Sequence, residues 1–256
     1  MKKFRGIFLK NDHEIGLLRE ANRIVSRILD ELGTLVQPGA ATMLFEDVAR
    51  ARCAEHHVRP AFLGYNGFPY VLCCSVNEEV VHGFPSRDRI LKEGDIVSFD
   101  MGVVYEGFYG DSARTFAVGE VSPQVRKLLD VTRQSLMKGI EQAKVGHNLY
   151  EISLAVQNCV EGAGLHVVRR YVGHGLGAHL HEKPEVPNFV PRGIQGPPLK
   201  AGMVLCIEPM VGLGTGEVEV LSDNWTAVTR DRSLSAHFEH CVAVTKDGPQ
   251  ILSVSD

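Results

Sequence analysis

The chain has 256 residues, of which 44% are apolar and 23% charged, and its formal net charge is −4. This composition is typical of a globular protein with a full core, and the mild acidity lacks the basic footprint of nucleic-acid binding. No apolar run approaches the roughly 18 residues of a membrane span, and the N-terminus lacks the apolar stretch of a signal peptide. We therefore expect a cytoplasmic protein with no membrane attachment.

The cysteines and the chain's continuity bear on its organisation. Six cysteines are scattered without a C-x-x-C pair in a chain long enough not to need disulfides, so we predict free thiols. No low-complexity linker divides the sequence, and we expect one domain over 1–256 and a monomer. The basic start, MKKFRGIFLK, leaves an association with RNA or the ribosome open.

Hydrophobic periodicity predicts two pairs of helices. The first pair covers about 12–35 and about 42–57, and the second covers about 122–144 and 149–164. Each pair of helices precedes a segment that is predicted to contain a buried strand. The two parts of the chain therefore have the same layout of helix, helix and strands. The layout indicates two related halves rather than a longer array of repeats.

The two segments that contain these buried strands also have similar sequences. LKEGDIVSFD at 91–100 and LKAGMVLCIE at 199–208 each contain a glycine turn, then a buried apolar strand that ends on a carboxylate, Asp100 or Glu208. A carboxylate removed from water without a partner costs several kcal/mol or becomes neutral. The two acids therefore require cations, hydrogen-bond donors or metal ions close by.

A pseudo-symmetric α/β (α+β) fold accounts for this repetition. Its halves, about 1–118 and 119–256, would pair their strands into one sheet and place their helices on its outer face. In that arrangement Asp100 and Glu208 meet at the middle of the sheet.

A hairpin brings a third acid to the same place. After Asp100 two strand-like runs are joined at Gly107, a residue that readily adopts the positive φ of a tight turn. We expect Tyr105 to pair with Phe108 across this turn. That register puts Asp111 within diagonal reach of Asp100 on the same face.

The C-terminal strand adds a fourth acid, and glycine-rich stretches add histidines. SAHFEHCVAVT alternates in polarity, which places Glu239 on its buried side. YVGHGLGAHLHEKPEV carries His174, His179 and His181 between glycines that let the backbone approach other groups closely. His82 lies in a similar bend, VVHGFP.

Four carboxylates and one imidazole suit two divalent ions, because the negative and positive charges balance. Such oxygen-rich ligand sets favour manganese, iron, cobalt or zinc over thiolate-seeking metals. Two ions about 3.5 to 4 Å apart can activate a water and polarise a carbonyl. The constellation therefore predicts a hydrolase.

The motifs FDMGVVYEGFYGDSARTF, GHGLGAHLHEKP, CIEPM and SLSAHFEH, in this order and spacing, closely resemble type I methionine aminopeptidases. The match covers nearly the whole chain and is similar to the compact bacterial form. The resemblance implies the pita-bread fold, a pseudo-twofold central antiparallel sheet with helices on its outer face. It also implies metal-dependent removal of the N-terminal methionine from nascent proteins when the second residue is small.

The resemblance implies a role for each candidate metal ligand. Asp100 would bind one divalent ion, and His174 and Glu208 would bind the other. Asp111 and Glu239 would bridge both ions, which the family takes as cobalt, iron, manganese or zinc.

It also implies catalytic and substrate-binding residues. His82 would contact the substrate near the scissile amide, His181 would hydrogen-bond the developing oxyanion, and Glu208 would shuttle a proton to the leaving amine. The implied methionine pocket consists of Tyr65, Phe68, Cys73, His82 and Trp225, and His181 is a further implied substrate-binding residue.

Two departures from the family pattern concern the pocket. Phe62 stands where many bacterial members carry a smaller cysteine, and Leu180 stands where an aromatic ring is frequent. The family's weak monovalent-cation site would involve Asn77, Glu79 and Ser235.

Two alternatives remain open. An Xaa-Pro aminopeptidase or dipeptidase shares the five ligands, although such relatives usually carry a large N-terminal domain. A non-enzymatic pita-bread binding module characteristically lacks ligands, whereas all five are present in this sequence.

Overall fold

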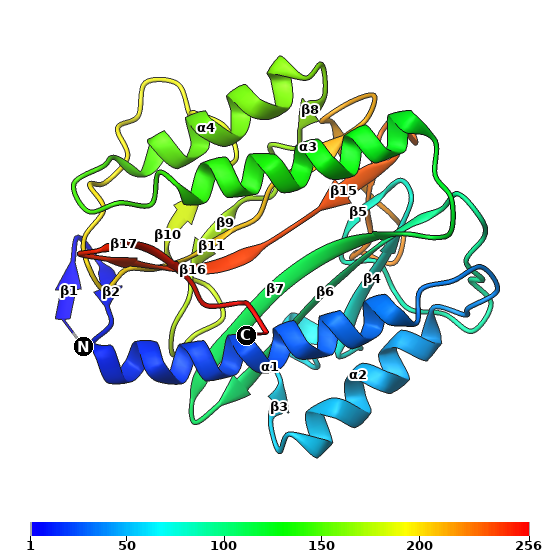
Figure 1. Ribbon diagram of the computed structural model, residues 1–256, viewed down its shortest axis with the longest axis horizontal. Helices are drawn as coiled ribbons and strands as arrows, with labels where there is room; N and C mark the ends of the chain where they lie inside the picture. The colour runs from blue at the N-terminus through cyan, green and yellow to red at the C-terminus, as the bar shows by residue number, and fades with distance from the viewer. Residues whose placement is uncertain (1, 256) are drawn as a thin grey trace.

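The computed structural model describes residues 2–255. Its helices form the two predicted pairs, α1 (Asp12–Thr34) with α2 (Met43–Glu55) and α3 (Pro123–Ile140) with α4 (Leu149–Gly162). In Figure 1, α1 and α3 run alongside the long strands that lie between them. The third helix ends before the predicted 144, because the chain turns more tightly there and the Ala143 N–H bonds the Ile140 carbonyl.

Local sequence explains where three of the helices begin. Asn11 caps α1, accepting from the Glu14 N–H while the Glu14 carboxylate accepts from the Asn11 N–H. Asn148 and Glu151 form the same reciprocal capping box at α4. Ser122 caps α3, with a proline at the first helical position. Each cap satisfies N–H groups that have no partner within the helix.

The first half builds a sheet around a long hairpin. Its strands are β3 (Arg59–Pro60), β4 (Leu72–Val76), β6 (Ile96–Tyr105) and β7 (Phe108–Ala117). The predicted register is confirmed, since Tyr105 pairs with Phe108 and Asp111 lies opposite Gly102, diagonally from Asp100. Asp100 itself lies inside β6 rather than at its end, because the residues after it continue the ladder with β7.

The second half builds a five-stranded antiparallel sheet in the order β10-β9-β11-β16-β17. Its strands are β9 (Gly173–Gly175), β10 (Glu182–Val186), β11 (Val204–Ile207), β16 (His240–Thr245) and β17 (Gly248–Ile251). Glu208 follows β11 directly, as predicted. The pairing of Cys206 with Cys241 fixes the register between β11 and β16.

Shorter strands complete the fold. They are β1 (Lys2–Phe4), β2 (Ile7–Leu9), β5 (Glu79–Val81), β8 (His166–Val167), β12 (Met210–Gly212), β13 (Val218–Val220), β14 (Ala227–Thr229) and β15 (Ser235–His237), with a short 3-10 helix, η1 (Tyr65–Gly67). β15 pairs with β12, and β5 pairs with β14.

The two sheets meet where β7 passes the segment between β15 and β16. The Glu239 N–H donates to the Ala113 carbonyl at 2.9 Å, and the Ser112 hydroxyl donates to the Glu239 carbonyl at 2.8 Å. The expected single sheet is therefore interrupted at its centre, because side-chain hydroxyls replace part of the ladder. The junction nevertheless holds Asp111 and Glu239 on adjacent segments.

Apolar side chains of the helices pack against both sheets. On the side of α1 and α2 the core includes Ile28, Leu29, Leu32, Phe45, Phe99 and Met101. On the side of α3 and α4 it includes Leu136, Ile140, Ile152, Leu205 and Val242. These buried surfaces fix the strands that carry the candidate ligands.

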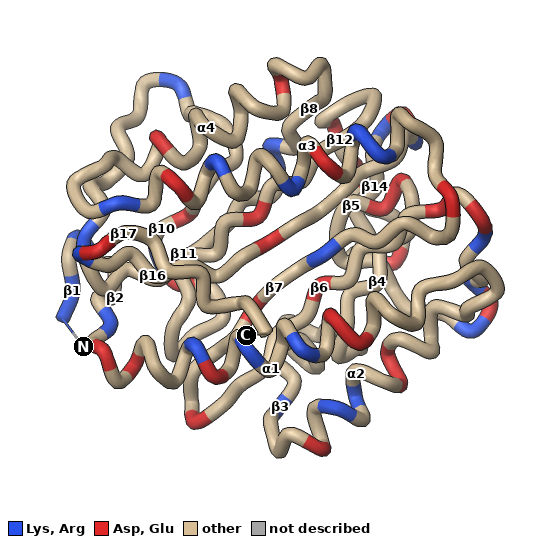
Figure 2. The backbone as a smooth tube through the Cα atoms, in the orientation of Figure 1, with Lys and Arg blue, Asp and Glu red and all other residues tan. Residues whose placement is uncertain are grey.

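The charged residues outside the core are mixed in sign. Figure 2 shows basic and acidic residues interspersed along the four helices. Within residues 2–255, none of the helices combines the length and apolar character that a membrane crossing requires. The described cysteines Cys53, Cys73, Cys74, Cys159, Cys206 and Cys241 are free thiols, as predicted.

Candidate metal centre and substrate cavity

A cavity of about 230 Å³ contains the candidate ligands and pocket residues. All the residues proposed from the sequence for metal binding, catalysis and substrate contact line it: Tyr65, Phe68, Cys73, His82, Asp100, Asp111, His174, His181, Glu208, Trp225 and Glu239. Phe62 and Leu180, the two departures from the family pattern, line it as well. His179 does not belong to this lining, and its largely exposed side chain lies beside Glu182.

Three of the acids have buried oxygen atoms without a hydrogen-bond partner in the described part of the chain. They are Asp100 Oδ1, Asp111 Oδ1 and Glu239 Oε1. Buried polar atoms are normally paired, so each such atom needs an explanation. A cation between the carboxylates would supply it.

The backbone of each bridging candidate is held firmly. The Asp111 N–H donates to the side-chain oxygen of buried Asn22 on α1 at 3.1 Å. Glu239 is fixed against β7 by the Ser112 hydroxyl and the Ala113 carbonyl described above. The Asp111 contact joins β7 to α1 within the first half, whereas the Glu239 contacts cross between the two halves, so the acids converge through tertiary pairing.

Burial and mutual repulsion disfavour the charged carboxylates. Burial raises the pKa of Asp100 to about 7 and the pKa of Glu208 to about 8. Burial and then the neighbouring carboxylates raise the pKa of both Asp111 and Glu239 well above the ordinary value. Divalent cations would remove this penalty by binding the charged forms.

His174 has the orientation that a metal ligand needs. Its Nδ1 lies 3.0 Å from the Gly175 carbonyl, a contact in which Nδ1 carries the proton. Its Nε2 lies 3.6 Å from both Asp111 Oδ2 and Glu208 Oε1. Burial lowers the pKa of His174 to about 3, so the Nε2 lone pair faces two carboxylate oxygens. That arrangement is unfavourable alone and fits a cation between the three groups.

The glycines beside His174 are required by close packing, as predicted. A side chain at Gly173 would collide with the Cys206 carbonyl, and one at Gly175 would collide with the Lys183 carbonyl. The absence of side chains lets β9 approach both neighbours and brings His174 to the cavity.

His181 is held by an aromatic hydroxyl. The Tyr65 hydroxyl lies 2.8 Å from His181 Nδ1, and the His181 ring centroid lies 4.4 Å from that of His174. Burial lowers the pKa of His181, which favours the neutral imidazole. When Tyr65 donates to Nδ1, the proton of the neutral ring is on Nε2.

His82 adopts a backbone conformation that is uncommon outside glycine, with φ of 61°. Its ring lies edge-on to Tyr171 and Trp225, with centroid separations of 5.5 and 6.1 Å. Burial, followed by the nearby His237 and His181, lowers the pKa of His82 to about 4. Left-handed non-glycine residues of this kind concentrate at functional sites.

An aromatic and thiol wall forms the apolar side of the cavity. Phe68 is 3% exposed and meets Trp225 edge-on, with a centroid separation of 5.1 Å. Cys73 is paired with Asp100 across β4 and β6, and burial raises its thiol pKa well above the ordinary value. This side of the cavity therefore offers neutral, polarizable surface.

The residues expected at the monovalent-cation site lie on β5, on the turn before it and on β15, which contacts β5. The Ser235 N–H donates to the Asn77 carbonyl at 2.9 Å. The Glu79 carboxylate accepts from the N–H of Val76, the residue before Asn77, at 2.7 Å.

Sequence reasoning missed three residues of the site. Cys206 lies close to Asp111, His174 and Glu239, with potential ligand atoms within 4.8 Å of one another. Burial raises its pKa well above the ordinary value, and a neutral thiol is a poor metal ligand. The position of Cys206, two residues before Glu208 along an extended segment, could have indicated from the sequence that it lies near the site.

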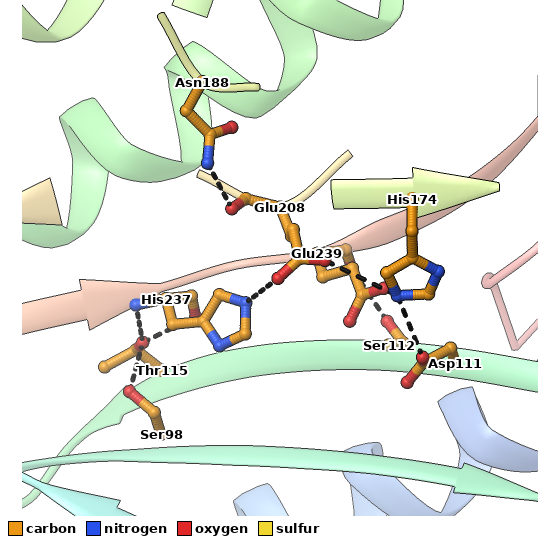
Figure 3. A network of polar contacts seen from close by, with 9 residues as sticks. All are labelled: Ser98, Asp111, Ser112, Thr115, His174, Asn188, Glu208, His237 and Glu239. Atoms are coloured by element: carbon orange, nitrogen blue, oxygen red, sulfur yellow. Dashed lines mark hydrogen bonds and ion pairs between the residues drawn. The ribbon is translucent and has the colours of Figure 1, made fainter. Parts of the chain in front are cut away.

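The other two missed residues are His237 and Tyr171. His237 stands two residues before Glu239 in the alternating segment, and Figure 3 shows its ring directed at Glu208. Tyr171 lines the cavity beside His82, and nothing in its local sequence marks it as a site residue.

Comparison with known proteins assigns the class. The model of Metallopeptidase family M24 matches residues 16–246. The chain therefore belongs to metallopeptidase family M24, and divalent-metal binding is a property of this family.

Curated relatives and solved structures show which members of the family this chain is similar to. The methionine aminopeptidase of Clostridium acetobutylicum is 48% identical over 250 residues, covering 98% of this chain and 100% of the relative. Methionine aminopeptidase 1 of Bacillus subtilis is 48% identical over 247 residues, covering 96% and 99%. The crystal structure of the Thermotoga maritima methionine aminopeptidase superposes with a TM-score of 0.94 at 44% identity, covering 97% and 99%. The resemblance to type I methionine aminopeptidases and the pita-bread fold are confirmed.

The likeness to a more distant neighbour shows the fold alone. The Xaa-Pro dipeptidase of Bacillus anthracis has a TM-score of 0.76 at 20% identity, and the match covers 97% of this chain but 62% of that one.

Proposed function

We propose that this protein is a dinuclear-metal methionine aminopeptidase that removes the N-terminal methionine from nascent proteins when the second residue is small. The observation that carries the proposal is the convergence of four carboxylates and His174 on one cavity, where His174 Nε2 lies 3.6 Å from both Asp111 Oδ2 and Glu208 Oε1. The relatives named methionine aminopeptidase, similar over nearly their whole length, support the substrate.

The donor set fits two divalent ions of cobalt, iron, manganese or zinc. Asp100 would hold one ion, His174 and Glu208 would hold the other, and Asp111 and Glu239 would bridge them. Bound ions would supply Lewis-acid activation of the scissile carbonyl and of a water. Oxygen and imidazole ligands accept several metals, so availability decides which one is used.

His181 is proposed to stabilise the charge that develops on the carbonyl oxygen. Tyr65 holds its Nδ1, which leaves a proton on Nε2 to donate to the oxyanion. Because burial lowers its pKa, the His181 ring is a neutral hydrogen-bond donor. It therefore carries no charge of its own when the oxyanion forms and when the oxyanion collapses. A fixed donor of this kind is most effective where water is excluded.

Glu208 and His82 are proposed to serve the leaving amine. A raised pKa suits Glu208 to taking a proton and delivering it near neutral pH. His82 would contact the substrate near the scissile amide, where Trp225 and Tyr171 limit its ring.

The methionine side chain would occupy the slot formed by Tyr65, Phe68, Cys73 and Trp225. A flexible thioether packs well against aromatic rings. His82 and His181 lie at the same cavity and would crowd a bulky second residue. Phe62 and Leu180 add apolar surface to the lining of the cavity and shape the slot in this protein.

The remaining features of the proposal concern the whole chain. We infer one catalytic domain of two pseudo-symmetric halves, about 1–118 and 119–256, acting as a cytoplasmic monomer on nascent chains. Association with the ribosome and a weak monovalent-cation site near Asn77, Glu79 and Ser235 belong to the same proposal.

Metal removal and refilling test the function. The metal-free protein should release no methionine from Met-Ala-Ser, and addition of manganese or cobalt under anaerobic conditions should start the release. Mass spectrometry of the peptide measures the product. Failure of cobalt, iron, manganese and zinc alike to support cleavage would favour a non-enzymatic binding module.

A further inference from the structure

His237 is clamped by its backbone between the two halves. The Thr115 hydroxyl accepts from the His237 N–H at 2.9 Å and donates to the His237 carbonyl at 2.7 Å. Ser98 lies 2.8 Å from the same hydroxyl and supplies its further hydrogen bond. Figure 3 shows this chain of contacts running from β6 through β7 to β15. These hydrogen bonds fix the His237 backbone and thereby the position from which its imidazole extends.

The side chain of His237 is buried and points to one acid. It is 2% exposed, and its Nε2 lies 3.6 Å from Glu208 Oε2. Within residues 2–255 this Nε2 has no hydrogen-bond partner, so a donor lies close to a carboxylate oxygen without completing a bond. Contacts of this kind are often long in the free enzyme and shorten when the site is filled.

Glu208 is held at both ends by different groups. The Asn188 side chain donates to the Glu208 backbone carbonyl at 2.9 Å. Its Oε1 lies 3.6 Å from His174 Nε2, whereas its Oε2 faces His237. The two carboxylate oxygens therefore have distinct neighbours, and only Oε1 is directed to a candidate metal ligand.

We propose that His237 is a positioning residue whose Nε2–H donates to Glu208 Oε2 and keeps Oε1 turned towards His174. The inference rests on the proposed function, because it concerns the carboxylate assigned to metal binding and proton transfer. His237 does not belong to the cavity lining. It therefore acts through Glu208 and not on the substrate. Partners that orient a ligand in this way typically govern metal affinity or turnover by about 10- to 100-fold.

Two variants separate donation from shape. His237→Leu keeps a similar volume but has no donor, whereas His237→Gln keeps an N–H donor at a comparable reach. We expect His237→Leu to lower kcat on Met-Ala-Ser by about 10- to 100-fold with KM unchanged. His237→Gln should restore most of the loss. Equal impairment of both variants, or a His237→Leu enzyme as active as the wild type, would overturn the proposal.

Calorimetric titration with manganese gives a readout that does not require turnover. His237→Leu should bind the metal about 10-fold or more weakly than the wild type, and His237→Gln should bind nearly as tightly. This result decides the proposal even when the wild-type protein fails to release methionine, an outcome that would count against the proposed function alone. Unchanged manganese affinity in His237→Leu would contradict the positioning role.

A spectroscopic measurement on the wild-type protein does not depend on how the variants fold. In ¹⁵N-labelled protein we expect the His237 Nε2 resonance to be that of a protonated nitrogen, and Glu208→Gln should shift it. An unprotonated Nε2, or a resonance insensitive to Glu208→Gln, would exclude donation to Glu208.

Discussion

Lys10 and Glu182 form a buried ion pair, with 2.7 Å between Lys10 Nζ and Glu182 Oε2, although 172 residues separate them in sequence. Lys10 lies just before α1, where its N–H donates to the Gly202 carbonyl at 2.8 Å. Glu182 directly follows His181, and its Oε1 accepts from the His179 N–H at 3.3 Å. The ion pair therefore links the segment that contains His179 and His181 to the segment that precedes α1.

Breaking this pair should be costly. Lys10→Met leaves Glu182 buried without its counter-charge, and the loss of one partner typically costs about 3–5 kcal/mol. Urea unfolding of the wild type and variant measures the difference. Lys10→Met/Glu182→Leu should recover much of the stability, because it removes both charges. A single variant as stable as the wild type would show that the ion pair contributes nothing to the fold.

The bridging acids should govern metal binding. Asp111→Ala and Glu239→Ala should each abolish tight binding of a metal pair, because the remaining carboxylates cannot neutralise two ions. Asp130→Ala, at an exposed position on α3, is the matched control and should keep the wild-type metal content. Elemental analysis after dialysis gives the ratio of metal to protein. Two retained ions with full activity in either bridging variant would exclude the assignment.

Two histidines of the cavity should give opposite phenotypes. His181→Ala should keep its metals and lose turnover by about 100- to 1000-fold, the usual effect of removing one oxyanion donor. His174→Ala should lose metal as well as activity. Metal content and kcat, measured on the same preparations, separate the two effects. The reverse pattern would exchange the two roles.

The metal-free protein should lose stability as pH rises from 6.5 to about 8. Across this window Asp100 and Glu208, with pKa values raised to about 7 and about 8, keep protons in the native state that the unfolded chain has already released. A native state that binds more protons than the unfolded state becomes less stable as pH increases. Histidines with lowered pKa values act in the opposite direction, but above their ordinary pKa of about 6.5 fewer than half of the unfolded imidazoles carry the proton, so their effect fades across the window.

Urea unfolding at both pH values, with and without manganese, measures this dependence. Bound metal should remove the decline, because the carboxylates are then charged and paired in the native state. Metal-free Asp111→Asn should show a weaker decline, since it lacks one of the titrating groups. Stability that is constant or rises over this window would contradict protonated acids in the metal-free protein.

Local patterns in the sequence predicted most of the framework. The helix boundaries follow from caps such as Asn11 and Asn148, which act within one turn. The hairpin register follows from Gly107, which supplies the turn, and from alternation along both strands. Asp111 and Asp100 could therefore be placed on one face from the residue pattern alone.

Contacts between distant segments could not be predicted in this way. The pairing of Lys10 with Glu182 and the approach of Asn188 to Glu208 depend on how the halves dock. His237 shares the alternation of Glu239, but its partner belongs to a different strand segment. Asp100 was expected at a strand end, because the sequence alone did not show that β6 continues past it.

Cleavage rates on a small set of peptides directly test the proposed removal of an N-terminal methionine that precedes a small residue. Equal amounts of metal-loaded protein are incubated with Met-Ala-Ser, Met-Leu-Ser, Met-Lys-Ser, Ala-Ala-Ser and a peptide with proline second, and products are followed by mass spectrometry. The aromatic slot and the crowded metal centre predict rapid release of methionine from Met-Ala-Ser, much slower release from Met-Leu-Ser and Met-Lys-Ser, and almost none of alanine from Ala-Ala-Ser. Preferential removal of any residue that precedes proline would contradict the account.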